Sequence, residues 1–258
     1  MKEGFHITVI GTGKVALQIG MQLRKAGHTI DNIWGRNEEN AKNLASKLAV
    51  TTIDNLSDIK ENSLALICVS DTAINNVLQN IPSSIKVAYT SGSIRIEDLK
   101  SREYLGVFYP LQTFSPTRTI NISEVPFLIE ASNKEFENEL FTLASTLSES
   151  VVLANSEDRY NTHIAAVMVN NFTNFLFHLA KKQLDSKNLD FSILKPLIKE
   201  TVAKLEDLTP IQAQTGPAAR GDKKVIENHI ATIADPKTKE LYRLMSELIY
   251  KEINNNEL

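Results

Sequence analysis

The chain has 258 residues, of which 42% are hydrophobic and 23% are charged, and its formal net charge at pH 7 is −3. This composition is typical of a globular protein with one large domain or two smaller ones, and the charge gives no indication of nucleic-acid binding. Cys68 is the only cysteine, which excludes an intramolecular disulfide and favours a reducing compartment. No apolar run is long enough to span a bilayer and no signal peptide precedes the first expected strand, so we expect a cytoplasmic protein with no membrane partner.

Residues 5–26 have the pattern of a dinucleotide-binding unit. A β-rich apolar run, FHITVI, is broken by Gly11-Thr12-Gly13, and a helix is predicted from Lys14 to Ala26. The glycines allow a sharp turn and a close approach of phosphate to the backbone. The helix N-terminus supplies free N–H groups and the positive end of a dipole. A glycine turn that binds nothing is the alternative interpretation. We expect the pyrophosphate to contact Gly11, Thr12, Gly13, Lys14 and Val15.

The end of the second predicted strand, residues 29–34, indicates which dinucleotide is bound. An acidic residue at this place would accept hydrogen bonds from the adenosine ribose and favour NAD. The chain has Gly35, Arg36 and Asn37 there instead, and Arg36 can form charge-assisted hydrogen bonds to a 2′-phosphate. Asn37 can add a hydrogen bond and also cap the helix that follows it. The cofactor is therefore predicted to be NADP, with a solvated surface arginine as the alternative interpretation of Arg36.

Strands and helices alternate through the first 155 residues. Further strands are predicted at residues 49–53, 63–69, 86–90, 104–109, 125–131 and 150–154. This alternation predicts an α/β fold with a doubly wound, mostly parallel Rossmann-like sheet of about eight strands. Ligands of such sheets bind at the carboxyl ends of the strands, which makes Ser70, Asp71 and Ser91 candidate cofactor contacts. A cap for the following helix by Asp71 or Thr72 is as good an interpretation of this turn as a cofactor contact by Ser70.

The pattern changes at residue 156. We therefore expect an NADP-binding domain at residues 1–155 and an all-helical domain at residues 156–258. A long helix is predicted at residues 157–182, and its middle, HIAAVMVNNFTNFLFHLA, is apolar around most of its circumference, which indicates burial on several sides. Two more helices are predicted at residues 191–208 and 239–254. No metal site is expected, because ligand spacing is missing around His6, His28, His178 and His229.

Three polar residues, His163, Asn170 and Asn174, interrupt the apolar surface of the long helix. At 3.6 residues per turn they fall within about 40° of one another. We place this stripe in a cleft between the domains, where His163 would be the proton donor or acceptor. The asparagines would hold the substrate or the cofactor amide. Structural hydrogen bonds between helices or at a dimer seam are the alternative interpretation.

Two candidates for substrate contact lie outside that helix. Gln112 follows the strand predicted at residues 104–109 and would line the cleft together with Ser91. Arg220 lies in the loop TPIQAQTGPAARGD at residues 209–222, where it could bind an anionic group. A rigid interhelical connector in which Asp222 caps a helix is the alternative for this loop, and the one that its prolines and glycines favour.

Several short stretches, taken in order, resemble a known group of proteins. They resemble NADP oxidoreductases that join a Rossmann-like domain to a C-terminal helical domain of unassigned function, a group similar to deazaflavin-dependent NADP oxidoreductases and pyrroline-carboxylate reductases. The resemblance covers nearly the whole chain and implies a helical domain like that of 6-phosphogluconate dehydrogenase, with a homodimer built through it. It implies no particular substrate. The stretches are Gly11-Thr12-Gly13, Ser70-Asp71, Thr90-Ser91-Gly92, YPLQTF at residues 109–114 and, most specific, TGPAARGD at residues 215–222.

One departure from the related β-hydroxyacid dehydrogenases bears on the mechanism. Those enzymes carry a catalytic lysine on the long helix, and this chain has none between Tyr160 and Ala180. His163 is the substitute that the geometry suggests. We expect an NADP-dependent oxidoreductase that moves hydride to or from a small carbonyl or imine substrate. A non-catalytic NADP(H)-binding sensor or structural dimer is the alternative, and hydride exchange with a deazaflavin or flavin is a third hypothesis.

Overall fold

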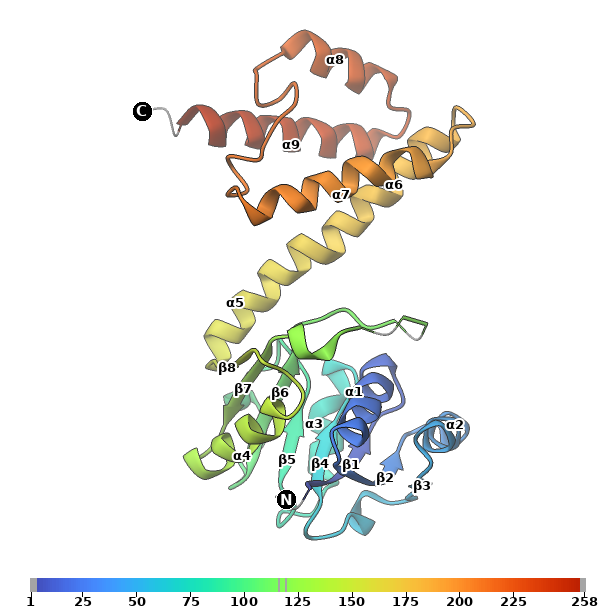
Figure 1. Ribbon diagram of the computed structural model, residues 1–258, viewed down its shortest axis with the longest axis vertical. Helices are drawn as coiled ribbons and strands as arrows, with labels where there is room; N and C mark the ends of the chain where they lie inside the picture. The colour runs from blue at the N-terminus through green and yellow to red at the C-terminus, as the bar shows by residue number, and fades with distance from the viewer. Residues whose placement is uncertain (1–3, 116, 119, 256–258) are drawn as a thin grey trace. The chain divides into compact units, whose positions relative to one another are not determined.

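The computed structural model describes residues 4–115, 117–118 and 120–255 (Figure 1). The chain divides into two compact units, Met1–Asn170 and Asn171–Leu258. The first unit holds one eight-stranded sheet with the strand order β3-β2-β1-β4-β5-β6-β7-β8. Neighbouring strands are parallel except for β6 and β7, which are antiparallel. The strands are β1 (His6–Ile10), β2 (Thr29–Trp34), β3 (Thr51–Thr52), β4 (Leu64–Ile67), β5 (Val87–Tyr89), β6 (Leu105–Pro110), β7 (Phe127–Ala131) and β8 (Val151–Leu153).

Helices cover both faces of this sheet, which confirms the predicted doubly wound fold. Ile7 and Val9 of β1 belong to one hydrophobic cluster, together with side chains of α1, α2 and α4. Ile10 belongs to a second cluster, which includes side chains of α3. Alternate residues of a strand point to opposite faces, so the two clusters lie on opposite sides of the sheet. The helices are α1 (Lys14–Lys25), α2 (Glu38–Leu48), α3 (Asp71–Gln79) and α4 (Lys134–Ser145).

The strand order reverses at β1, because β2 and β3 lie on one side of it and β4 lies on the other. In open α/β sheets the crevice at the carboxyl ends of the strands at such a reversal is where ligands bind. The chain turns sharply there at Gly11, whose φ is +124° and whose missing Cβ would lie 2.3 Å from the carbonyl oxygen of Cys68. No other residue type fits this turn without moving β4 away.

The end of the first unit is formed by α5 (Ser156–Ala166). A π-helical segment, Val167–Phe172, and then α6 (Thr173–Asp185) continue the helical run into the second unit. The predicted long helix is thus present, but its geometry is not α-helical throughout. π-helical turns are rare and occur as short bulges inside α-helices, and no hydrophobic periodicity marks them in advance.

The second unit is helical, as predicted, but in the single chain it has almost no core. Among its described residues, only Ala218 and Ser246 are buried. The prediction that the apolar stretch of the long helix is buried on several sides is wrong for one chain by itself, since Phe172 and Phe175 are 59% and 54% exposed. Its remaining helices are α7 (Lys195–Ala203), α8 (Lys223–Thr232) and α9 (Pro236–Asn255).

Two further results concern the described residues only. None of their helices has both the length and the apolar character needed to cross a bilayer. Within the same ranges, no three His, Cys, Asp or Glu side chains are grouped so that they could hold a metal ion.

Candidate functional site

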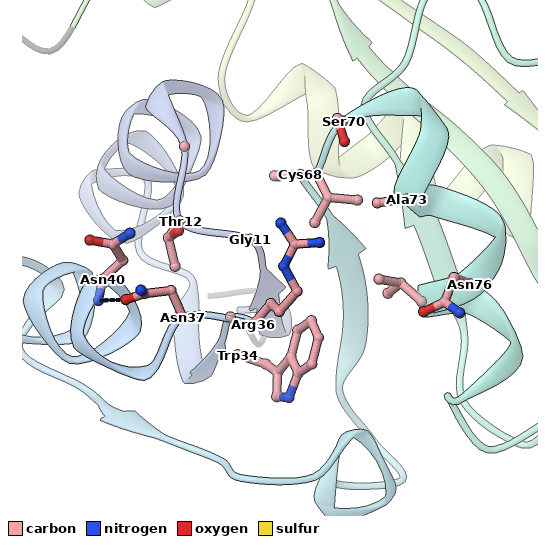
Figure 2. Close-up of a pocket in the computed structure, with 14 residues that line it drawn as sticks. Gly11, Thr12, Trp34, Arg36, Asn37, Asn40, Cys68, Ser70, Ala73 and Asn76 are labelled. Atoms are coloured by element: carbon pink, nitrogen blue, oxygen red, sulfur yellow. Dashed lines mark hydrogen bonds between the residues drawn. The ribbon is translucent and has the colours of Figure 1, made fainter.

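A cavity of about 340 Å³ opens at the carboxyl edge of the sheet, beside the turn between β1 and α1. The predicted residues Gly11, Gly13, Arg36 and Ser70 line it, and Trp34 is among the lining residues that the sequence did not single out. Figure 2 shows Arg36 extending into the space between the β1–α1 turn and α3, with the Trp34 ring beside it. Gly11, Gly13, Arg36 and Ser70 therefore line one cavity, although they follow three different strands, β1, β2 and β4. Thr12, Gly35 and Asn37 line the same cavity.

The first turn of α1 is free to receive an anion. Its N-cap residue, Gly13, makes no side-chain capping hydrogen bond, whereas Asn37 caps α2 by accepting from the N–H of Asn40 at 2.8 Å. The N-terminal N–H groups of a helix have no partners within the helix, so an uncapped α1 presents donors toward a bound phosphate. Lys14 lines a neighbouring cavity of about 260 Å³ rather than the first one. Val15 packs against the core.

Arg36 is exposed, and within the described residues no ion pair is formed by its guanidinium. Glu38, the nearest acidic residue in sequence, forms its ion pair with Lys42. The guanidinium is therefore available for a ligand phosphate, for which its planar fork of donors is well suited.

Cys68 lines the cavity as well, but its thiol is chemically quiet. Burial raises its pKa to about 12, so it stays protonated near neutral pH and is a poor nucleophile. Cys68 is buried directly after β4, which ends one residue earlier than the strand predicted at residues 63–69 would require for Cys68 to lie inside it.

A second group of polar side chains lies at the carboxyl ends of β5 and β6. The Tyr109 hydroxyl is 3.0 Å from Nδ1 of His163, and the two rings meet edge to face with their centroids 6.1 Å apart. Gly92 packs directly against both, because a Cβ built on it would lie 2.7 Å from Cζ of Tyr109 and 2.8 Å from Nδ1 of His163. The sequence analysis singled out His163 but gave Tyr109 no role, although Tyr109 ends a predicted strand and begins the stretch YPLQTF that carries part of the resemblance.

The loop that contains Gly92 is held by its own hydroxyl groups. The buried Ser91 hydroxyl accepts hydrogen bonds from the N–H groups of Ser93 and Ile94, each at 3.1 Å. The Ser93 hydroxyl in turn donates to Asp71. Ser91 and Asp71 thus lie near the Tyr109–His163 pair, but the hydrogen bonds of the Ser91 side chain are made within the loop.

Helix α5 is fixed to the sheet by Arg159, one turn before His163. Arg159 is 1% exposed, and its guanidinium donates to the carboxylate of Glu130 on β7 and to the carbonyl of Ile94. The Ser156 hydroxyl donates to the same carboxylate at 3.0 Å. Because residues four apart share a helix face, this anchor determines where His163 meets β6.

The roles of the remaining predicted residues stay predictions. The expected stripe of His163, Asn170 and Asn174 assumed an unbroken 3.6-residue period, and the π-helical segment Val167–Phe172 interrupts that period. Asn170 lies in that segment and Asn174 lies in the second unit. Arg220 is exposed in the second unit, and Gln112 is exposed and accepts a hydrogen bond from the N–H of Thr113 at 2.8 Å.

The loop that contains Arg220 has the structure of a connector. Asp222 caps α8 by accepting from the N–H of Val225 at 3.2 Å, as the alternative interpretation of this loop predicted. Gly216 and Gly221 have φ values of +107° and +66°, which explains both glycines of this stretch.

Comparison with known proteins assigns both parts of the chain. Residues 6–89 match a family described as NADP oxidoreductase, coenzyme F420-dependent, and residues 125–249 match a domain of unknown function. A Bacteroides fragilis protein of known structure that is classed as an NADP oxidoreductase is 36% identical, with a TM-score of 0.88. The match covers 96% of this chain and 98% of that protein. No curated protein matches the chain significantly in sequence.

Two more distant structures show the same fold. A reductive aminase from Aspergillus terreus, in complex with NADPH and ethyl levulinate, is 16% identical with a TM-score of 0.71, and the match covers 98% of this chain and 95% of that one. A 1-pyrroline-5-carboxylate reductase from Streptococcus pyogenes is 17% identical with a TM-score of 0.63, covering 98% and 96%. The identity to the Bacteroides protein is high enough to assign the family. The chain belongs to the family of proteins classed as NADP oxidoreductases, in which an NADP oxidoreductase domain precedes a domain of unknown function.

Proposed function

We propose that this chain transfers hydride between the nicotinamide of NADP(H) and a small carbonyl or imine substrate, with His163 handling the proton. The observation that carries the proposal is the Tyr109–His163 pair, 3.0 Å apart. It lies at the carboxyl edge of the same sheet whose β1–α1 turn is shaped for a dinucleotide. One edge thus offers both a place for a cofactor and a group that can move a proton.

The residues around the cavity fit NADP. The turn at Gly11 excludes a side chain, and α1 begins without a capping side chain, so a pyrophosphate can accept hydrogen bonds from backbone N–H groups. At the other end of the cavity, Arg36 would bind the 2′-phosphate and Asn37 would add a hydrogen bond. When bound, the cofactor supplies or accepts the hydride, and the protein supplies binding, orientation and electrostatics.

His163 is the proton-handling group that the site offers. Reduction of a carbonyl or imine places a hydride on carbon and requires a proton at the oxygen or nitrogen. His163 is half-buried and held in place through Tyr109, and imidazole is the side chain whose ordinary pKa lies nearest to neutral pH. The class of substrate is supported by the reductive aminase and the pyrroline-carboxylate reductase, whose names state chemistry at a carbonyl-derived or imine group.

A His163→Asn substitution separates an enzyme from a non-catalytic binding protein. Consumption of NADPH would be followed in the purified protein with a panel of small aldehydes, ketones and cyclic imines. Loss of a general acid or base typically costs about 10²–10⁴-fold in rate, so we expect the variant to lose turnover while NADPH binding remains. The matched control is His178→Asn on α6, which should keep the rate.

If the wild-type protein binds NADPH and turns over none of the panel, the result favours a non-catalytic sensor or structural dimer over an enzyme. If His163→Asn turns over substrate at the wild-type rate, the role of His163 is wrong.

A deazaflavin as the hydride partner is the second candidate. It is supported by the description of the N-terminal family, which includes dependence on coenzyme F420. Adding reduced deazaflavin to the substrate panel distinguishes the two candidates, because only this one predicts NADP reduction by the deazaflavin.

A second copy of the chain is the partner that we propose for the helical unit. Leu197 and Val202 of α7 are each 63% exposed, and Leu248 of α9 is 53% exposed. A helical unit with two buried residues among those described cannot be stable in water through its own packing. Every copy carries the same uncovered surface, so an isologous pair would bury both at once, as hydrophobic obligate homodimers do.

A further inference from the structure

The contact between Tyr109 and His163 fixes more than the position of a ring. An imidazole has two nitrogens, and in its neutral form one carries a proton while the other accepts a hydrogen bond. Which nitrogen carries the proton is determined by the hydrogen bond that the other one makes. At His163 the only hydrogen-bond partner recorded among the described residues is the Tyr109 hydroxyl, which contacts Nδ1 at 3.0 Å.

The direction of this hydrogen bond follows from the surroundings of Tyr109. Burial raises the pKa of its hydroxyl, and the Asp71 carboxylate on α3 raises it further, against a weaker opposing effect of Arg159 on α5. The charge of Arg159 is itself balanced by Glu130 on β7. The tyrosine therefore keeps its proton, and within the described residues Nδ1 of His163 is the one hydrogen-bond partner of its hydroxyl. If the hydroxyl accepted from Nδ1–H, its own proton would have no acceptor there, which is unfavourable for a half-buried group. We therefore take Tyr109 as the donor and Nδ1 of His163 as the acceptor.

The other side of the ring is the open one. Gly92 packs against the contact between Tyr109 and His163, because a Cβ atom added to it would lie 2.8 Å from Nδ1. Helix α5 cannot rotate away, because Arg159 ties it to β7 and to the carbonyl of Ile94. Nδ1 is thus enclosed, and Nε2 has no partner of its own within the described part of the chain.

We infer that Tyr109 is a positioning residue that holds neutral His163 as the Nε2–H tautomer, with Nε2–H as the donor presented to the substrate. The tautomer of His163 is a property of the free protein. Only the statement that Nε2–H faces a substrate rests on the proposed function. The ligand atom that this arrangement suits is an acceptor, such as a carbonyl oxygen or an imine nitrogen.

The chain contains its own reference for this tautomer. His28 accepts a hydrogen bond at Nδ1 from the backbone N–H of Phe5, at 3.2 Å, and its Nε2 lies 2.8 Å from the Thr146 hydroxyl. A backbone N–H can only donate, so neutral His28 must carry its proton on Nε2. Burial also lowers the pKa of His28, which keeps it neutral.

The test is a long-range ¹H–¹⁵N spectrum of the uniformly ¹⁵N-labelled full chain at about pH 8.5, some two units above the ordinary histidine pKa. Each neutral tautomer has its own pattern of ring-nitrogen shifts and couplings, and His163→Asn identifies the His163 signals by their loss. We expect His163 to show the same pattern as His28. In Tyr109→Phe the His163 signals should shift toward a mixture of tautomers, while the His28 pattern is unchanged.

The control for loss of a hydroxyl is Tyr160→Phe, on the same helix, which should leave the His163 pattern unchanged. A wild-type His163 that carries its proton on Nδ1 would overturn the inference, and so would a Tyr109→Phe protein whose His163 pattern is unaltered. Neither result depends on turnover. Failure of NADPH binding would instead refute the proposed function and leave the tautomer intact.

Discussion

Arg159 and Glu130, which are 29 positions apart, form an ion pair that joins α5 to β7, with the arginine side chain 1% exposed. Breaking such a pair by removing one partner costs about 3–5 kcal/mol, because the other charge stays buried. The pair therefore has a structural role and a functional one, since it also fixes the helix that carries His163.

We expect Arg159→Met to destabilise the first unit by about 3–5 kcal/mol and Arg159→Met/Glu130→Gln to destabilise it less. The chain has a single tryptophan, Trp34, which lies in the first unit, so its fluorescence during urea unfolding reports on this unit. A double variant as unstable as the single one would show that the loss does not come from an unpaired charge.

The stability of the first unit should depend on the charge of His28 as the pH falls below about 7.5. Burial lowers the pKa of His28 in the folded state, so the unfolded chain binds the proton more readily. Folding free energy is then lost as the pH falls through the ordinary histidine pKa of about 6.5 toward the folded value.

We expect the midpoint of urea unfolding to fall less steeply with pH in His28→Asn than in the wild type. Thr146→Val removes the hydrogen-bond partner of Nε2 but keeps the imidazole, so it should lower stability and keep the pH dependence. The same pH dependence in wild type and His28→Asn would assign the effect to other groups.

A charge placed on the exposed apolar surface of the second unit should dissociate the proposed dimer. Leu197→Glu is expected to shift the mass in sedimentation velocity from two chains to one and to lower the thermal midpoint. The control is Met21→Glu on α1, an exposed apolar position in the first unit that is 50% exposed in the single chain. A wild-type chain that is monomeric and unfolds cooperatively at micromolar concentration would refute the proposed dimer.

Local patterns carried much of the fold. The alternating strands, the glycine turn at Gly11 and the caps by Asn37 and Asp222 depend on residues a few positions apart, and the structure confirms each of them. Helix α8 was not predicted from the sequence, because its residues Lys223–Thr232 are mixed in polarity.

The parts that sequence could not give depend on long-range packing. Tyr109 and His163 are 54 positions apart in the chain. No local sequence pattern at either residue predicts contact with the other. The π-helical segment shifts the helix phase without any change in apolar spacing. The apolar stretch around Phe172 did indicate burial, but its cover is missing from the single chain, and a sequence pattern does not say which chain supplies it.

The central claim is that the β1–α1 turn and Arg36 hold NADP. Titration of NADPH and NADH side by side, followed by the fluorescence of Trp34 in the cavity, tests it most directly. Hydrogen bonds to a charged phosphate are worth about 1.5–3 kcal/mol, so NADPH should bind about tenfold more tightly or better. Arg36→Ala should remove this preference, and Arg24→Ala on the far end of α1 should not. Equal binding of both nucleotides by the wild type, or binding of neither, would contradict the account.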